Sequence, residues 1–140
     1  MEYRKGYADS YHWSILSSSI GIGLTGRPVF SIAIKNTDDH LRNHGFLLTD
    51  AGWRLSPAYD INPTHFGTGL SLNISEDDNS LDFELALSVA PYFRLSKSKA
   101  EDIITQIKKT VSKWPALADK YQISRQEQAQ MSQAFELAMG

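Results

Sequence analysis

Residues 36–63, NTDDHLRNHGFLLTDAGWRLSPAYDINP, contain the pattern that predicts the β-structure of this chain. Two short apolar runs, Gly45 to Leu48 and Trp53 to Leu55, flank the connection Thr49-Asp50-Ala51-Gly52. Apolar runs on either side of a short connection that contains Asp and Gly are typical of a β-hairpin. The segment from Ser56 to Pro63 contains two prolines, which disfavour regular structure. We therefore predict a β-hairpin that is followed by an irregular segment.

The chain before this stretch favours two helices. Tyr7 to Ile20 mixes aromatic, polar and aliphatic residues and predicts a first helix. Gly21 to Gly26 matches the G-x-G-x-x-G fingerprint of phosphate-binding loops, but that fingerprint requires a preceding strand. Because an apparent helix precedes it here, we interpret this segment as a plain loop between helices. Pro28 to Ile34 is rich in apolar residues and begins with proline, which favours the first turn of a second, buried helix.

The C-terminal half predicts one more strand and then helices only. From Leu70 to Ile74 apolar residues alternate with polar ones, which is typical of a short strand. Leu81 to Ala90 is apolar and predicts a short helix. Asn79 or Ser80 precedes this helix and suits its N-cap.

An amphipathic stripe marks the longest expected helix. Apolar residues recur at spacings of three and four from Ala100 to Trp114, which places them on one helix face. Ser98 and Glu101 have the spacing of a capping box at its head, and Ser124 and Glu127 have the same spacing before a last helix. The predicted fold class is therefore mainly α (α+β): a helical domain with a small antiparallel β-hairpin.

The composition bounds the class of protein. The 140 residues, 41% of them hydrophobic, predict one domain that covers residues 1–140. The formal net charge of −2 gives no general attraction to nucleic acid or to an anionic membrane. The absence of cysteine excludes disulfides and thiolate metal sites. No signal-like start follows Met1 and no apolar run approaches about 18 residues, so we expect a soluble, cytoplasmic protein with no membrane partner.

Asp38, Asn43 and Asp60 are the residue types of a phosphoryl-transfer site. Asn43 follows Asp38 by five positions, and Asp60 lies 22 residues beyond Asp38, past the predicted hairpin. Phosphoryl transfer needs a carboxylate that orients and deprotonates the attacking hydroxyl. It also needs an amide oxygen and a second carboxylate to hold Mg²⁺, which prefers hard oxygen ligands. Kinase catalytic loops have these residues in the same order, so the pattern indicates a kinase-like magnesium site.

Several residues of this stretch also have simpler interpretations. Asp38 alone suits the cap of a turn, and Asp39 and Arg42 suit solvated loop residues or a local ion pair. His40 and His44 are four residues apart and suit one helix face as metal ligands, but the zinc-protease motif His-Glu-x-x-His is absent. The nearby acid oxygens favour magnesium over zinc.

Two segments, residues 36–47 (NTDDHLRNHGFL) and 53–63 (WRLSPAYDINP), resemble the catalytic core of HipA-type kinases. These are the serine/threonine kinase toxins of bacterial HipBA toxin–antitoxin systems. The family pattern is Asn-x-Asp-x-His-x-x-Asn, followed after a hairpin by Leu-x-Pro-x-Tyr-Asp. Arg27, nine residues before Asn36, matches a position that the family tends to fill with Arg. The helix that ends near Trp114 and the tail after it are similar too, so the resemblance covers nearly the whole chain.

The resemblance implies a role for each matching residue. Asp38 would be the catalytic base, and Asn43 and Asp60 would be the ligands of Mg²⁺, with ATP as the second cofactor. His40 would be the catalytic-loop histidine that supports the loop. The implied reaction is transfer of the ATP γ-phosphate to a Ser or Thr hydroxyl of a protein substrate. The implied partner is a HipB-type antitoxin with a helix-turn-helix, so contact with nucleic acid would be indirect.

The N-terminal lobe of such kinases is the main departure from the resemblance. That lobe carries the phosphate-covering loop and the ATP-binding lysine, whereas only 37 residues precede Asp38 here, with Lys5 and Lys35 as their lysines. We therefore expect a C-terminal lobe that needs the missing N-terminal lobe and binds ATP poorly alone. Two alternatives stay open. One is a non-catalytic, truncated remnant that binds an antitoxin or a partner lobe, and the other is a phosphoesterase that uses Asp38, Asp60 and His65.

Overall fold

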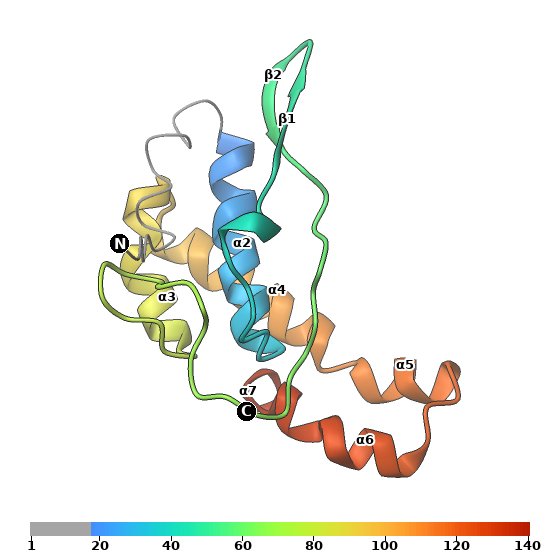
Figure 1. Cartoon of the computed structure of the whole chain (residues 1–140). Coiled ribbons are helices and arrows are strands. Elements are labelled where there is room, and N and C mark those ends of the chain that lie inside the picture. Colours follow the sequence, from blue (N-terminus) through green and yellow to red (C-terminus); the bar gives the residue numbers. More distant parts are fainter. Residues whose placement is uncertain (1–17) are drawn as a thin grey trace, which may run out of the picture.

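Figure 1 shows a computed structural model of the chain, which describes residues 18–140, with side chains from residue 26 onward. The expected helix from Tyr7 to Ile20 lies outside the described residues except for its last three positions, which belong to α2. Helices dominate and two strands form a small antiparallel sheet, so the mainly α (α+β) class is confirmed. Within residues 18–140, no helix has both the length and the apolar character needed to cross a membrane. The elements in chain order are α2 (Ser18–Ala33), η2 (Leu41–Asn43), β1 (Phe46–Thr49), β2 (Gly52–Leu55), α3 (Phe83–Val89), η3 (Ala90–Phe93), α4 (Lys97–Val111), α5 (Trp114–Lys120), α6 (Arg125–Met131), η4 (Ser132–Phe135) and α7 (Glu136–Met139).

One continuous helix, α2, lies at the centre of the described structure and packs against α3, α4 and α7 (Figure 1). It runs through Gly21 to Gly26, so the predicted loop between two helices is wrong. Each glycine in a helix interior costs about 1 kcal/mol relative to alanine, and Pro28 inside the helix removes a backbone donor. Val29 and Ile32 are at most 1% exposed, and their packing in the core offsets these local costs.

The core gathers side chains from α2, α3 and α4 and from an irregular segment between β2 and α3. In this segment the alternating apolar residues from Leu70 to Ile74 are buried, but they form no strand, so the predicted third strand is wrong. A single bridge joins Gly69 to Ser80. The Leu70 N–H donates to the Asn79 carbonyl at 2.9 Å, which closes the segment on itself. Alternate side chains therefore reach the core without a neighbouring strand.

The predicted helix starts are right for α6 and shifted for two other helices. Asp82 caps α3 in place of Asn79 or Ser80, and Ser96 caps α4 in place of Ser98. Asp, Asn and Ser are about equally good N-caps, so residue type alone does not choose among neighbours. The capping box before α6 is confirmed. The apolar stripe of α4 is also confirmed, because it faces the core.

The predicted hairpin is confirmed, with Phe46 opposite Leu55 and Leu48 opposite Trp53 in antiparallel register. At its base, Phe46 and Leu55 pack against the core. At its tip, Leu48 and Trp53 are exposed, and the hairpin extends away from the helices (Figure 1). The hairpin thereby brings the segment that enters β1, which carries the first candidate site residues, back beside the segment that leaves β2, which carries Asp60.

Candidate functional site

The loop between α2 and β1 carries three of the four predicted site residues. It leaves α2 through Lys35, whose backbone is left-handed (φ 53°), and then forms one short turn, η2. Asp38 is exposed before this turn, and its carboxylate accepts no hydrogen bond from another residue in the described part of the chain. Asn43 ends the turn and is only 6% exposed. The loop therefore presents one carboxylate to solvent and buries one amide.

Asn43 and Asp60 are in direct contact. Asn43 Nδ2 donates to Asp60 Oδ2 at 2.9 Å, and Asn43 Oδ1 accepts from the His40 N–H at 3.0 Å. The other Asp60 oxygen, Oδ1, accepts from Asn62 Nδ2 at 2.9 Å. Asp60 has φ 54°, a left-handed backbone that non-glycine residues rarely adopt and that concentrates at functional sites. The structure thus joins two candidate residues that are 17 positions apart in the sequence.

His40 supports this arrangement through its backbone. Its N–H orients the Asn43 amide, as described above. Within the described residues, the buried ring nitrogen Nδ1 of His40 has no hydrogen-bond partner. A histidine that transfers protons commonly has its second nitrogen oriented by a carboxylate or carbonyl, so this geometry is consistent with the expected supporting role.

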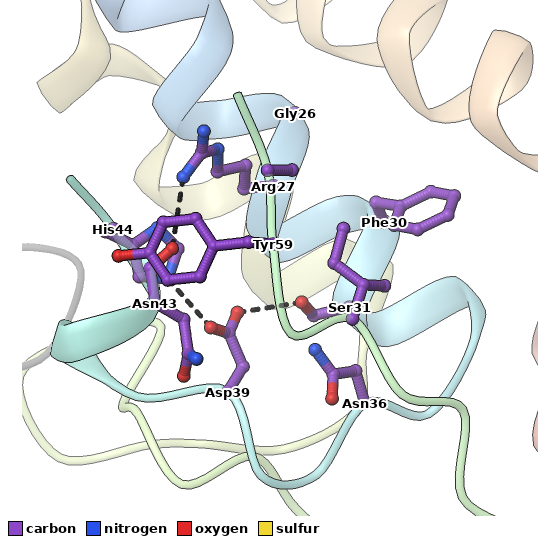
Figure 2. A pocket seen from close by; sticks show the side chains of 11 residues that line it. Gly26, Arg27, Phe30, Ser31, Asn36, Asp39, Asn43, His44 and Tyr59 are labelled. Atoms are coloured by element: carbon purple, nitrogen blue, oxygen red, sulfur yellow. Dashed lines mark hydrogen bonds and ion pairs between the residues drawn. The ribbon is translucent and has the colours of Figure 1, made fainter. Parts of the chain in front are cut away.

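Arg27 of α2 connects the two segments that carry the Asn43–Asp60 pair. Its guanidinium donates to the Asn43 carbonyl at 3.3 Å and to the Ser56 carbonyl, at the exit of the hairpin. The Tyr59 hydroxyl donates to the Arg42 carbonyl and adds a second link between the same segments. Figure 2 shows Arg27, Asn43 and Tyr59 around a common cavity.

The segment after the hairpin also holds the residue that precedes Asp38. Ser71 donates to the Thr37 carbonyl from its backbone N–H (3.0 Å) and from its hydroxyl (2.8 Å). Thr64 Oγ1 lies 3.1 Å from Thr37 Oγ1. Gly67, with φ 90°, passes so close that a Cβ there would lie 2.9 Å from Thr37 Cγ2. Thr37 is therefore clamped, and its neighbour Asp38 is held at a defined place.

Asp39 is buried, which corrects the prediction of a solvated residue or an ion pair with Arg42. Its Oδ2 accepts from Ser31 Oγ and its Oδ1 lies against His44 Nε2, each at 2.8 Å (Figure 2). Arg42 is exposed. The loop before η2 therefore turns Asp38 to solvent and Asp39 toward α2, where partners compensate its charge.

The structure also places the residues of the two alternative sites, the zinc site and the phosphoesterase site. Within residues 26–140, no three His, Cys, Asp or Glu side chains are grouped so that they could hold a metal by themselves. His65 packs edge-on against Phe66, with ring centres 5.2 Å apart. In the described part of the chain, no hydrogen bond joins His65 to Asp38 or Asp60.

A cavity of about 280 Å³ lies between α2, the loop and the segment after β2 (Figure 2). Small-molecule sites usually enclose about 300–1,000 Å³, so this cavity alone does not enclose a nucleotide. Its lining residues are Gly26, Arg27, Phe30, Ser31, Asn36, Asp39, Asn43, His44, Ala58, Tyr59 and Ile61.

Residues 22–114, about two thirds of the chain, match the HipA-like C-terminal domain family. The chain belongs to this family. The matched part of the HipA-like domain includes Asp38, His40, Asn43 and Asp60, and it ends at Trp114, where α5 begins. No curated protein and no protein of solved structure matches the chain.

The oxygen donors of this HipA-like domain fit Mg²⁺. Asn43 has an amide oxygen and Asp60 has a carboxylate, and the two side chains touch through Asn43 Nδ2, while Asn43 Oδ1 accepts from the His40 N–H. Joint binding of Mg²⁺ by Asn43 Oδ1 and Asp60 would therefore require the Asn43 amide to turn. Mg²⁺ is usually bound by one or two carboxylates together with water and substrate phosphates, so two protein ligands suffice.

Of the two α2 residues that support the HipA-like site, the sequence indicates Arg27, through the family resemblance, but not Ser31. From the sequence, Ser31 has no predicted role, and His44 is a candidate zinc ligand only. Arg27 and Ser31 are four residues apart, which places them on the same face of α2. A hydroxyl within an otherwise apolar helical run was the signal that could have pointed to Ser31.

Proposed function

We propose that this domain is the catalytic C-terminal part of a HipA-type serine/threonine kinase, which transfers the ATP γ-phosphate to a protein hydroxyl. The hydrogen bond between Asn43 and Asp60, in the same loop system as the exposed Asp38, is the observation that supports it best. An amide oxygen and a carboxylate for Mg²⁺, together with a free carboxylate for the substrate hydroxyl, are the parts that phosphoryl transfer requires. The family match supports the same reaction class.

Each side chain has a distinct task in the proposed reaction. Asp38 would orient the substrate hydroxyl and accept its proton. Asn43 and Asp60 would hold Mg²⁺, which offsets negative charge on the phosphate groups. The His40 N–H donates to Asn43 Oδ1 and Arg27 donates to the Asn43 carbonyl, so the backbone that carries this ligand is held in place, and its amide would turn its oxygen to Mg²⁺ when the metal binds.

The nucleotide and the partners are further parts of the proposal. An N-terminal lobe would supply the phosphate-covering loop and the lysine for ATP, since the cavity beside Asn43 does not enclose a nucleotide. The substrate would be a protein with an accessible Ser or Thr. A HipB-type antitoxin would bring the helix-turn-helix, so the domain itself would meet nucleic acid only indirectly.

A titration with Mg²⁺ and Mn²⁺, followed by NMR, tests the metal site. Wild type should show chemical-shift changes with Mg²⁺ and paramagnetic broadening with Mn²⁺, both centred on Asn43 and Asp60. Asp60→Ala should lose both responses because it removes the carboxylate ligand. Asp102→Ala removes an exposed carboxylate from α4 and is the matched control, which should respond as wild type does.

A phosphorylation assay tests the activity, with Mg·ATP, a Ser/Thr protein substrate and a HipA-type N-terminal lobe supplied in trans. Asp38→Asn should lower the rate by at least about 10²-fold, because general-base catalysis is worth that much. No metal response in wild type would contradict the kinase proposal and favour a non-catalytic domain that binds an antitoxin or partner lobe. Phosphoester hydrolysis without nucleotide would instead favour the phosphoesterase.

A further inference from the structure

A buried carboxylate lies directly beside the proposed base. Asp39 is 3% exposed, and its two oxygens contact Ser31 Oγ and His44 Nε2, each at 2.8 Å. The His44 side chain is also buried, with 8% exposed. Burial of a carboxylate is costly unless hydrogen bonds and a partner compensate it. The three side chains therefore form one compensated polar unit inside the domain (Figure 2).

This unit connects both ends of the loop with α2. Asp39 follows Asp38 in the chain, and His44 follows Asn43. One carboxylate thus links the backbone next to the proposed base with the backbone next to the proposed metal ligand. Ser31 fastens the same carboxylate to α2, which is the central helix of the fold.

We propose that Ser31, Asp39 and His44 are positioning residues that hold Asp38 and Asn43 at a fixed separation for the reaction. This inference rests on the proposed function, because it takes Asp38 as base and Asn43 as metal ligand. Asp39 is 3% exposed and its two oxygens face Ser31 and His44, so Asp39 acts through its neighbours and does not itself touch the reacting atoms.

Loss of the Asp39 side chain should first weaken the hydrogen bond from the His40 N–H to Asn43 Oδ1, because both residues lie in the loop between Asp39 and His44. Without the Asp39 carboxylate the two ends of the loop lose their common anchor. Thr37 keeps its hydrogen bonds from Ser71 and the carbonyl of Asn43 keeps its contact with Arg27, so the loop loosens between these two points, where His40 lies. The His40 amide should therefore open more often.

Hydrogen exchange of the His40 amide, measured by NMR in the metal-free domain, tests the network. Asp39→Ala should raise its exchange rate by about tenfold or more, while the amides of β1 and β2 keep their rates. Asp39→Asn keeps the size of the side chain, with an oxygen that can accept from Ser31 and an amide nitrogen beside His44 Nε2, so it should stay near wild type. Asp102→Ala is the control for loss of a carboxylate elsewhere. An unchanged His40 rate in Asp39→Ala would overturn the proposal.

Mn²⁺ affinity provides a second readout that a merely structural role would not move. Asp39→Ala should bind Mn²⁺ about tenfold more weakly, and Asp39→Asn should restore the affinity. An affinity unchanged in both variants would overturn the positioning role. Absence of Mn²⁺ binding in wild type would refute the proposed function instead, while the exchange of the His40 amide still decides whether the network holds the loop.

If Asp39→Ala does not fold, the same measurement of His40 amide exchange can be made on Ser31→Ala. It removes one hydrogen bond and leaves the Asp39–His44 contact in place. A faster His40 exchange in this variant, smaller than that expected for Asp39→Ala, supports the network. A wild-type rate in Ser31→Ala overturns it.

Discussion

The candidate site and the start of α6 use polar contacts of different range. At the site, Arg27 bonds the Asn43 carbonyl across 16 positions, and Asn43 bonds Asp60 across 17. In the C-terminal helices, Ser124 and Glu127 cap α6 from three positions apart. The short contacts form with the helix that they cap. The long contacts exist only when α2, the loop and the hairpin have assembled.

This difference in range predicts which part of the molecule each substitution should affect. Contacts that close long loops depend on the whole tertiary structure, because other interactions must first offset the entropic cost of bringing the ends of the loop together. Loss of such a contact should change the geometry of the site, whereas loss of a local cap should change the stability of one helix end. Three substitutions of decreasing expected effect test this contrast.

Ile32→Ala should have the largest effect and should disturb both regions. Ile32 is fully buried on α2, which packs against both α4 and α7. Large-to-small changes of buried Ile cost about 2–5 kcal/mol because of lost transfer energy and the cavity left behind. Denaturant unfolding measures this free energy, and hydrogen exchange should accelerate in the loop and in α7 alike. A loss of free energy confined to one region would contradict the central role of α2.

Arg27→Ala should have an intermediate effect, limited to the site. It removes the donors to the Asn43 and Ser56 carbonyls, and hydrogen bonds from a charged group contribute about 1.5–3 kcal/mol. Urea unfolding gives the loss of stability, and the Asn43 side-chain NMR signal reports the change in geometry. Lys109→Ala, on the exposed face of α4, is the matched control and should leave both unchanged. Faster hydrogen exchange of the α6 amides in Arg27→Ala would contradict the contrast between the site and the start of α6.

Ser124→Ala should have the smallest effect, limited to the start of α6. Loss of a Ser N-cap costs about 1 kcal/mol. Hydrogen bonds from Ser124 lower the pKa of the Glu127 carboxyl, so this cap stabilises the fold above the ordinary Glu pKa and loses that contribution as the pH falls through the lowered value. Carboxyl titration by NMR should show a higher Glu127 pKa in Ser124→Ala. A shift of the Asn43 or Asp60 signals in this variant would contradict the separation of the two regions.

Several patterns that act over a few residues predicted their structures correctly, although the equally local caps of α3 and α4 were shifted. The connection between Leu48 and Trp53 and the Ser124–Glu127 spacing are both local, so the hairpin and the capping box were recognisable from sequence alone. The apolar stripe on α4 was recognisable for the same reason. The roles of Asp38, His40, Asn43 and Asp60 stay predictions, although the structure brings Asn43 and Asp60 into contact.

Patterns whose outcome depends on burial were misread. Gly21 to Gly26 has poor helix propensity, yet it is helical because α2 as a whole packs in the core. The alternation from Leu70 to Ile74 has the period of a strand, yet no neighbouring strand pairs with it. In both cases tertiary packing outweighed a local preference of about 1 kcal/mol per residue.

The order and identity of Asp38, Asn43 and Asp60, the hairpin between them and the mainly helical class are properties of the sequence itself. Only the tertiary structure determined that Asp39 turns inward to Ser31 and His44 while Asp38 faces solvent. Adjacent Asp residues are chemically identical in the sequence. Their surroundings differ only after α2 and the loop come together, because burial and hydrogen-bond partners are set by residues distant in the chain.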